Sequence, residues 1–173
     1  LWIYRDEIEK LASNKYVTGN QIKLPESLLK RIVRFHLLDD VRGTPDMWRK
    51  SELKVAEFSA NVYDKPDNSR FITFTGKFKM VTSSGSRGYE GTIKGEISLD
   101  KLKFTINRFR AFADGKAWGR GTYTPFPPEG KYGLHIGLKE ALDDVARVVP
   151  PEAVSTANND REYRDPSIEG GGD

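Results

Sequence analysis

The sequence predicts a mainly β domain with a minor α component, in which an antiparallel meander forms a lipocalin-like barrel or a strongly curved sheet. Three observations favour this fold. Between residues 53 and 138, apolar and polar side chains alternate, as expected when successive side chains of a strand point to opposite faces. Turn-forming residues separate the alternating runs, and no helical crossover of the kind that parallel strands need lies between them. Two segments with helical periodicity precede the first run.

The two N-terminal helices are expected over residues 1–12 and 25–38, packed against the sheet. Pro25 suits the first turn of the second helix. The apolar residues of that helix recur on one side, while Arg31 and Arg34 lie on the other. This amphipathic pattern is typical of a lid over an open end or face of a sheet.

Six strands are expected, over residues 53–63, 71–81, 89–99, 102–113, 117–124 and 132–138. In the fourth strand the apolar parity changes after Ile106, which predicts a bulge near Asn107 or Arg108. The first strand shows a similar slip. Asp114-Gly115 is a type I′ turn signal and predicts a hairpin between the fourth and fifth strands.

Residues 1–149 are expected to form one domain, followed by an acidic, extended tail over residues 150–173. The tail contains six acidic and two basic residues, which leaves 26 basic and 19 acidic residues in the domain. This positive balance permits an anionic partner without requiring one. The absence of cysteine excludes disulfides, thiolate catalysis and cysteine-ligated zinc. No segment is long and apolar enough to predict a transmembrane helix, and no cofactor is expected.

His36, Asp39 and Asp40 are candidates for a metal site or an acid–base site. His36 and Asp40 are four residues apart and share a face if the helix continues to residue 40. Alternatively, His36 packs its ring under the sheet and the aspartates end the helix. No zinc motif of known spacing is present, and therefore no metal ligand is assigned.

Arg108, Arg110 and Arg120 are candidates for binding an anionic ligand, with Trp118 beside them. If the fourth strand has no bulge, Arg108 and Arg110 point inward, where a guanidinium needs a carboxylate partner or an anionic ligand. With Arg120 they would bind a carboxylate or phosphate group in a barrel mouth. If the bulge is present, both arginines face solvent instead.

Lysines on the polar faces of the strands suggest a second kind of anionic partner. Lys77, Lys79, Lys94 and Lys103 could line up across neighbouring strands and meet nucleic acid. Binding of single strands, however, requires exposed aromatic rings next to the charges. The aromatic residues have the opposite parity and are expected in the core, so nucleic acid is the less favoured partner.

Several short segments resemble a family of uncharacterised bacterial proteins. They are Phe35–Gly43 (FHLLDDVRG), Trp48-Arg49, Arg87–Gly91 (RGYEG), Trp118–Thr124 (WGRGTYT) and Pro128–Gly130. The family has no established activity, so the resemblance assigns no catalytic role. It implies that the FHLLDD and WGRGTY segments belong to one unit, with Asp39 or Asp40 pairing to Arg42 or Arg120. It also implies an exported protein, periplasmic or secreted, that is often part of a longer chain.

The sequence leaves three functions open. The leading hypothesis is a non-catalytic binding or interaction module for a small apolar or anionic ligand, or for another domain of the same chain. The first alternative is a hydrolase-type or metal-assisted enzyme that uses His36, Asp39 and Asp40. The second alternative is a surface that binds anions or nucleic acid.

Overall fold

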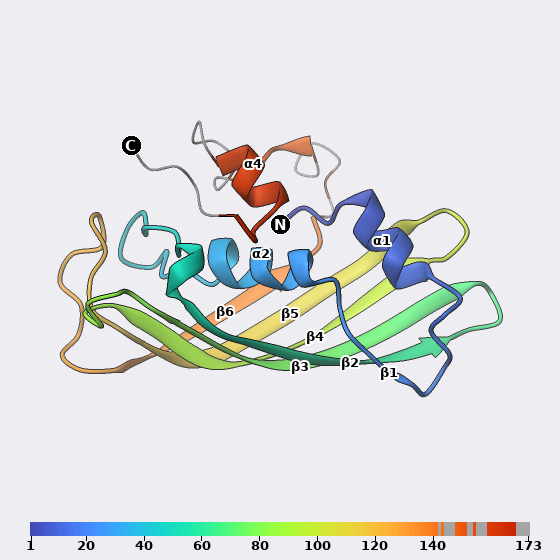
Figure 1. Ribbon diagram of the computed structural model, residues 1–173, viewed down its shortest axis with the longest axis horizontal. Helices are drawn as coiled ribbons and strands as arrows, with labels where there is room; N and C mark the ends of the chain where they lie inside the picture. The colour runs from blue at the N-terminus through green and yellow to red at the C-terminus, as the bar shows by residue number, and fades with distance from the viewer. Residues whose placement is uncertain (142, 144–147, 152–153, 155–158, 169–173) are drawn as a thin grey trace.

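The structure is a computed structural model that describes residues 1–141, 143, 148–151, 154 and 159–168. One sheet of six antiparallel strands forms its base, and the strands are ordered as they occur in the chain (Figure 1). The strands are β1 (Gln21–Ile22), β2 (Leu53–Asp64), β3 (Ser69–Val81), β4 (Gly88–Asp100), β5 (Thr105–Trp118) and β6 (Tyr132–Lys139). The predicted antiparallel meander is therefore confirmed.

The sheet is open, so the expected lipocalin-like barrel is wrong. Among the described residues, β1 pairs with β2 and β6 pairs with β5, and the two edge strands do not meet. The sheet also does not curl strongly (Figure 1). Helices α1 (Arg5–Ala12) and α2 (Glu26–His36) cover one face of the sheet. Because these helices bury the apolar face, the sheet does not have to close on itself to remove that face from water.

The face toward the helices, called here the inner face, is a filled core. Ile72, Phe74 and Phe78 of β3 and Ile93 and Ile97 of β4 are all buried there. They pack against the apolar side of α2, from which Leu28, Leu29, Ile32 and Val33 are buried in the same cluster. The predicted burial of these strand residues is confirmed. Side chains of this core fill the space between the sheet and the helices.

Bulges in β2 and β5 explain the parity changes seen in the sequence. The register between β4 and β5 shifts between Ser98 and Leu99, which leaves Asn107 without a partner. The register between β2 and β3 shifts in the same way at Lys54. Each bulge inserts one residue, so every later side chain of the strand changes face. The bulge predicted at Asn107 or Arg108 is therefore confirmed.

The expected hairpin at Asp114-Gly115 is wrong, because β5 continues through both residues to Trp118. Gly115 lies opposite Gly91 of β4. A Cβ on Gly115 would come within 2.8 Å of the Tyr89 ring, so this glycine makes room within the sheet rather than a turn. The expected strand over residues 117–124 is consequently absent, and the sixth strand is the short β1.

The tail is not simply an extended arm, since part of it folds back onto the helices. Residues 159–164 form α4 (Asn159–Arg164), which lies over α2 (Figure 1). Tyr163 is fully buried against Phe35. Arg34 pairs with Glu162, and its guanidinium also donates to the carbonyl of Pro166 at 2.8 Å. The expected extended tail is thus corrected for its described residues.

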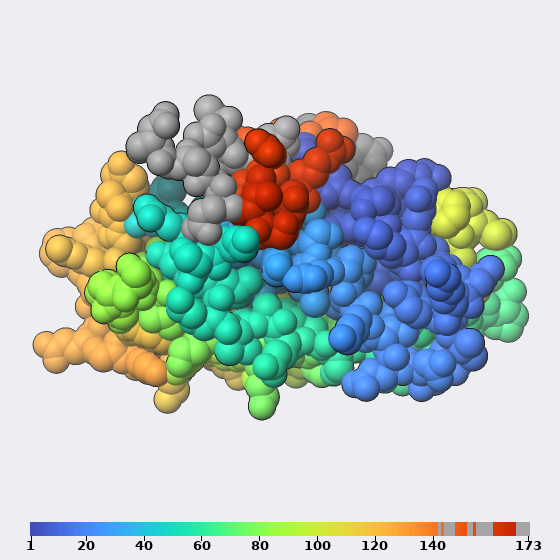
Figure 2. All heavy atoms as spheres, in the orientation of Figure 1, coloured from blue at the N-terminus to red at the C-terminus, as the bar shows by residue number. Residues whose placement is uncertain are grey.

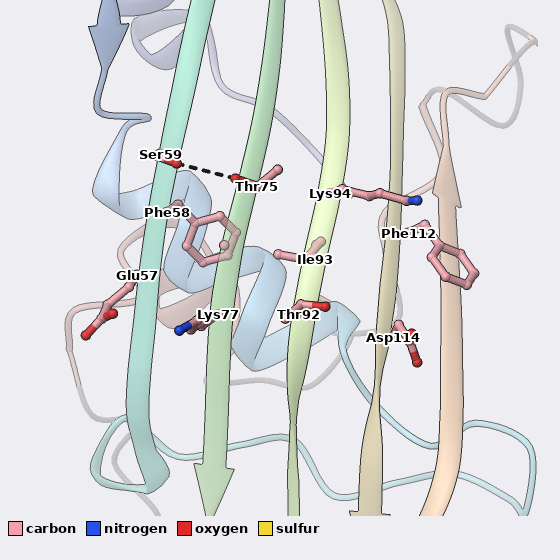
Figure 3. Close-up of a pocket in the computed structure, with 11 residues that line it drawn as sticks. Glu57, Phe58, Ser59, Thr75, Lys77, Thr92, Ile93, Lys94, Phe112 and Asp114 are labelled. Atoms are coloured by element: carbon pink, nitrogen blue, oxygen red, sulfur yellow. Dashed lines mark hydrogen bonds between the residues drawn. The ribbon is translucent and has the colours of Figure 1, made fainter.

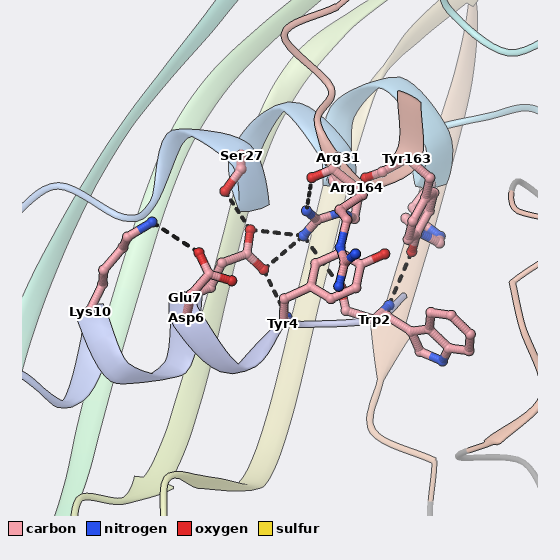
Figure 4. Close-up of polar contacts among 10 residues, drawn as sticks. Trp2, Tyr4, Asp6, Glu7, Lys10, Ser27, Arg31, Tyr163 and Arg164 are labelled. Carbon is pink, nitrogen blue, oxygen red and sulfur yellow. Dashed lines mark hydrogen bonds and ion pairs between the residues drawn. The ribbon is translucent and has the colours of Figure 1, made fainter. Parts of the chain in front are cut away.

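Arg31 and Arg34 are buried, although the helical pattern placed them on the polar side of α2. Arg31 donates to both carboxylate oxygens of Glu7 at 2.8 and 2.9 Å, and to the carbonyl of Tyr163 at 2.7 Å (Figure 4). The side of α2 that faces away from the sheet is covered by α1 and the tail, which supply these acceptors. No helix in the described part of the chain is long and apolar enough to cross a membrane.

Candidate functional site

The segment after α2 is joined to the β5–β6 loop through Arg42. Its guanidinium pairs with Asp39 at 2.7 Å and donates to the carbonyls of Gly119 and Thr124 at 3.1 Å each. The Tyr132 hydroxyl accepts from Arg42 at 2.5 Å and donates to Asp39 at 2.9 Å. Desolvation and the bond to Asp39 raise the pKa of Tyr132. The implied pairing of Asp39 with Arg42 is therefore present, and it joins the FHLLDD and WGRGTY segments.

Two glycines allow three loops to meet beside this junction. Gly43 has φ +139° and lies so close to Tyr123 that an added Cβ would be 2.4 Å from its carbonyl oxygen. Gly119 has φ +76°, and a Cβ there would be 1.9 Å from the carbonyl oxygen of Ser86. Any other residue would strain the backbone and separate the loops. The segment 43–52, the β3–β4 turn and the β5–β6 loop are thus packed together (Figure 2).

These loops enclose a pocket of about 720 Å³, called here the end pocket. Three arginines line it, one from each loop: Arg49, Arg87 and Arg120. Hydroxyl groups of Thr82 and Ser86 also line it. Arginine guanidiniums and hydroxyls are the donors that proteins use to bind carboxylate and phosphate. The composition of the pocket therefore favours an anionic ligand.

Arg87 is the most firmly positioned of the three arginines. Its guanidinium carbon lies 4.0 Å from the centre of the Trp48 ring, and Nη2 donates to the carbonyl of Asp46 at 2.5 Å. Desolvation lowers its pKa, but an arginine stays charged in proteins. Among the described residues, every buried side-chain nitrogen has a hydrogen-bond partner. The guanidinium nitrogens of Arg87 that have no acceptor are therefore not fully buried, and Arg87 lines the pocket.

The two acidic residues of the end pocket are occupied by backbone donors. Asp46 accepts the N–H of Thr122 at 2.6 Å, and Glu52 accepts the N–H of Arg49 at 2.9 Å. In the described part of the chain, neither Arg49 nor Arg120 forms an ion pair within the distance of a salt bridge. Three cations and two engaged carboxylates leave the pocket with a positive surplus.

Of the residues proposed to bind an anion, the structure places only Arg120 in the end pocket. Arg108 and Arg110 follow the bulge in β5 and face solvent on the outer face, which is the face opposite the helices. Trp118 lies at the end of β5, where its Nε1 donates to the carbonyl of Gly85 at 3.0 Å. The expected inward cluster is therefore not formed. No periodic pattern in the sequence pointed to Arg49 or Arg87, because both lie outside the strands.

His36, Asp39 and Asp40 do not converge. His36 hydrogen-bonds through Nε2 to the Tyr163 hydroxyl at 2.8 Å, and burial lowers its pKa to about 3. Asp39 is held by Arg42, whereas Asp40 and His36 line a separate depression. The described residues contain no group of three or more metal-ligating side chains with the spacing of a metal site. The three side chains therefore do not form the single acid–base or metal cluster that was considered.

Comparison with known proteins gives no match to a family model, to a curated protein or to a solved structure.

Proposed function

We propose that this chain is a non-catalytic binding module that holds an anionic group, a carboxylate or a phosphate, in the end pocket. The observation that carries the proposal is Arg87, stacked on Trp48 with donors that are not fully buried and flanked in the same pocket by Arg49 and Arg120. A stacked guanidinium is already ordered before the ligand arrives, so less conformational entropy is lost on binding. The anion would belong to a small molecule or to a segment of a partner domain.

Two features support binding rather than catalysis. The described residues lining the end pocket include no histidine or cysteine, and its two carboxylates already accept backbone N–H groups. The enzyme alternative based on His36 receives no support, because its Nε2 is hydrogen-bonded to the Tyr163 hydroxyl and Asp39 is paired with Arg42. A ligand inside a barrel is not proposed, since the core fills the inner face.

The experiment measures binding of citrate and of inorganic phosphate by isothermal titration calorimetry at low ionic strength. Hydrogen bonds to charged groups contribute about 1.5–3 kcal/mol each. The double variant Arg49→Ala/Arg120→Ala removes two exposed guanidiniums without touching the core, so it should weaken binding by at least about tenfold. A matched control, Lys15→Ala/Lys23→Ala, removes two exposed charges between α1 and α2 and should bind normally.

A result in which neither anion binds at millimolar concentration would overturn the proposal. Equal weakening in the control variant would also overturn it, because the effect would then reflect net charge rather than the pocket. Thermal unfolding of each variant checks that the fold is retained.

A further inference from the structure

The outer face of the sheet is uncovered and has an excess of basic residues. Helices lie on the inner face alone in the described part of the chain (Figure 1). On the outer face, Glu90 pairs with Lys79 at 2.9 Å and with Lys131 at 2.5 Å. Glu96 lies 3.7 Å from Arg108. Among the described residues, no ion pair forms at Lys77, Lys94, Arg110, Lys116 or Lys139.

An aromatic ring lies among these cations, contrary to the expectation that all aromatic residues face the core. The bulge at Asn107 turns Phe112 to the outer face, where it is 43% exposed. Its ring is parallel to that of His135, with an interplanar angle of 6° and centroids 6.1 Å apart. Lys94 is directly opposite Phe112 on β4, and Figure 3 shows both beside a depression of about 600 Å³ on this face, which Lys77 and the carboxylates of Glu57 and Asp114 also line.

On the β6 side of this ring the surface is open to solvent. Gly137 is the partner of Phe112 on β6, and an added Cβ there would meet nothing within 4 Å. Arg110 and Lys139 are opposite each other, two residues along their strands from this pair. Same-face residues of a strand are roughly 6.6–6.8 Å apart, so these two cations lie close to the ring on one side. On the other side, the next pair along the strands is Asp114 with His135, whose side chains are 3.1 Å apart.

We propose that the outer face binds single-stranded nucleic acid. A base would stack on the ring of Phe112, and Lys94, Arg110 and Lys139 would bind the backbone phosphates. A flat aromatic surface bordered by unpaired cations is the arrangement that recognises bases and phosphates without reading sequence. An acidic peptide would use the same cations, but it would gain little from the exposed ring of Phe112. This site is separate from the end pocket and does not depend on the function proposed for it.

The test measures fluorescence anisotropy of a labelled oligothymidylate of about 12 nucleotides, within the site sizes typical of such surfaces. Phe112→Ala should weaken binding roughly 5- to 150-fold, whereas Phe112→Tyr keeps a stacking ring and should bind like the unmodified chain. The double variant Lys94→Gln/Lys139→Gln should reduce the slope of log affinity against log salt by about 1.4, because each lost phosphate contact contributes about 0.7. The control Lys15→Gln/Lys23→Gln should leave the slope unchanged.

Absence of binding at low salt would overturn the proposal. So would an unchanged affinity in Phe112→Ala, or tighter binding of an oligoglutamate peptide than of the oligothymidylate, which would indicate an acidic protein partner. The double variant Arg49→Ala/Arg120→Ala should retain the oligothymidylate even if it loses citrate, so the failure of one proposal is distinguishable from that of the other. Phe112 and both lysines are exposed, and circular dichroism confirms that each variant is folded.

Discussion

Removing the carboxylate of Glu7 should destabilise the protein severely, because Arg31 would be left charged and buried. The two side chains are 1% and 0% exposed, respectively. The carboxylate also accepts the hydroxyl of Ser27 at 2.5 Å and the backbone N–H of Tyr4 at 2.9 Å (Figure 4). Loss of one partner of a buried ion pair costs about 3–5 kcal/mol, since the remaining charge has no compensation.

The variant Glu7→Ala should therefore lose about 3–5 kcal/mol of unfolding free energy. For a domain of this size, each kcal/mol corresponds to about 2–4 °C in melting temperature, so the midpoint should fall by roughly 6–20 °C. Urea denaturation followed by circular dichroism gives the free energy, and an unchanged m-value would show that the unfolding transition is otherwise the same.

Glu9→Ala is the matched control on the same helix. Glu9 pairs with Arg5 at 3.1 Å, but their side chains are 49% and 68% exposed, so the pair should contribute no more than about 1 kcal/mol. The double variant Glu7→Leu/Arg31→Met removes both buried charges and should recover much of the loss. The reasoning is refuted if Glu7→Ala and Glu9→Ala lose the same free energy, or if the double variant is less stable than Glu7→Ala.

Three further predictions concern other parts of the fold. The hydrogen bond from Arg70 lowers the pKa of Asp64 to about 2. The ionised carboxylate therefore stabilises the fold above its unfolded pKa, and this contribution is lost as the pH falls from about 4 to 2. In acid titrations, Asp64→Asn should make the free energy of unfolding less dependent on pH in that window. Gly91→Ala places a Cβ 2.2 Å from the carbonyl oxygen of Asp114 on the facing strand, so it should lower the unfolding free energy, measured by urea denaturation, by about 1–3 kcal/mol. Gly137→Ala is the control and should lower it less, because an added Cβ there meets nothing within 4 Å. Tyr163→Phe removes a hydroxyl that is hydrogen-bonded to His36 of α2 and to the backbone N–H of Trp2. It should lower the unfolding free energy by about 1–3 kcal/mol. An unchanged melting temperature would contradict the packing of the tail on α2.

The sheet was predictable from the sequence because its inner face is apolar and its outer face is polar. Alternation with a period of two residues sets which face each side chain occupies, and a break in it reveals a bulge. The shift after Ile106 therefore predicted a bulge near Asn107 or Arg108, and the structure has it at Asn107. Asp114-Gly115 misled because its local turn preference is weaker than the pairing of a continuous β5 with β4 and β6.

The candidate sites were predictable only in part. Arg120 was a candidate anion ligand, and the pairing of Asp39 with Arg42 was one of the pairings that the resemblance implied. The end pocket is also lined by Arg49 and Arg87, which come from separate loops. Their meeting depends on close backbone contacts at Gly43 and Gly119 that no periodic pattern records.

By itself, the sequence determined the antiparallel meander, the two N-terminal helices and the side of the sheet that is buried, because these follow from periodicity and from neighbours along the chain. Only the tertiary structure decided that the sheet stays open, that Arg31 and Arg34 are buried, and that the tail packs over α2. The open sheet depends on the helices that cover its apolar face. The burial of the two arginines and the packing of the tail depend on contacts between residues more than a hundred positions apart, such as Arg31 with Tyr163, and local patterns do not encode which distant acceptor a buried donor will find.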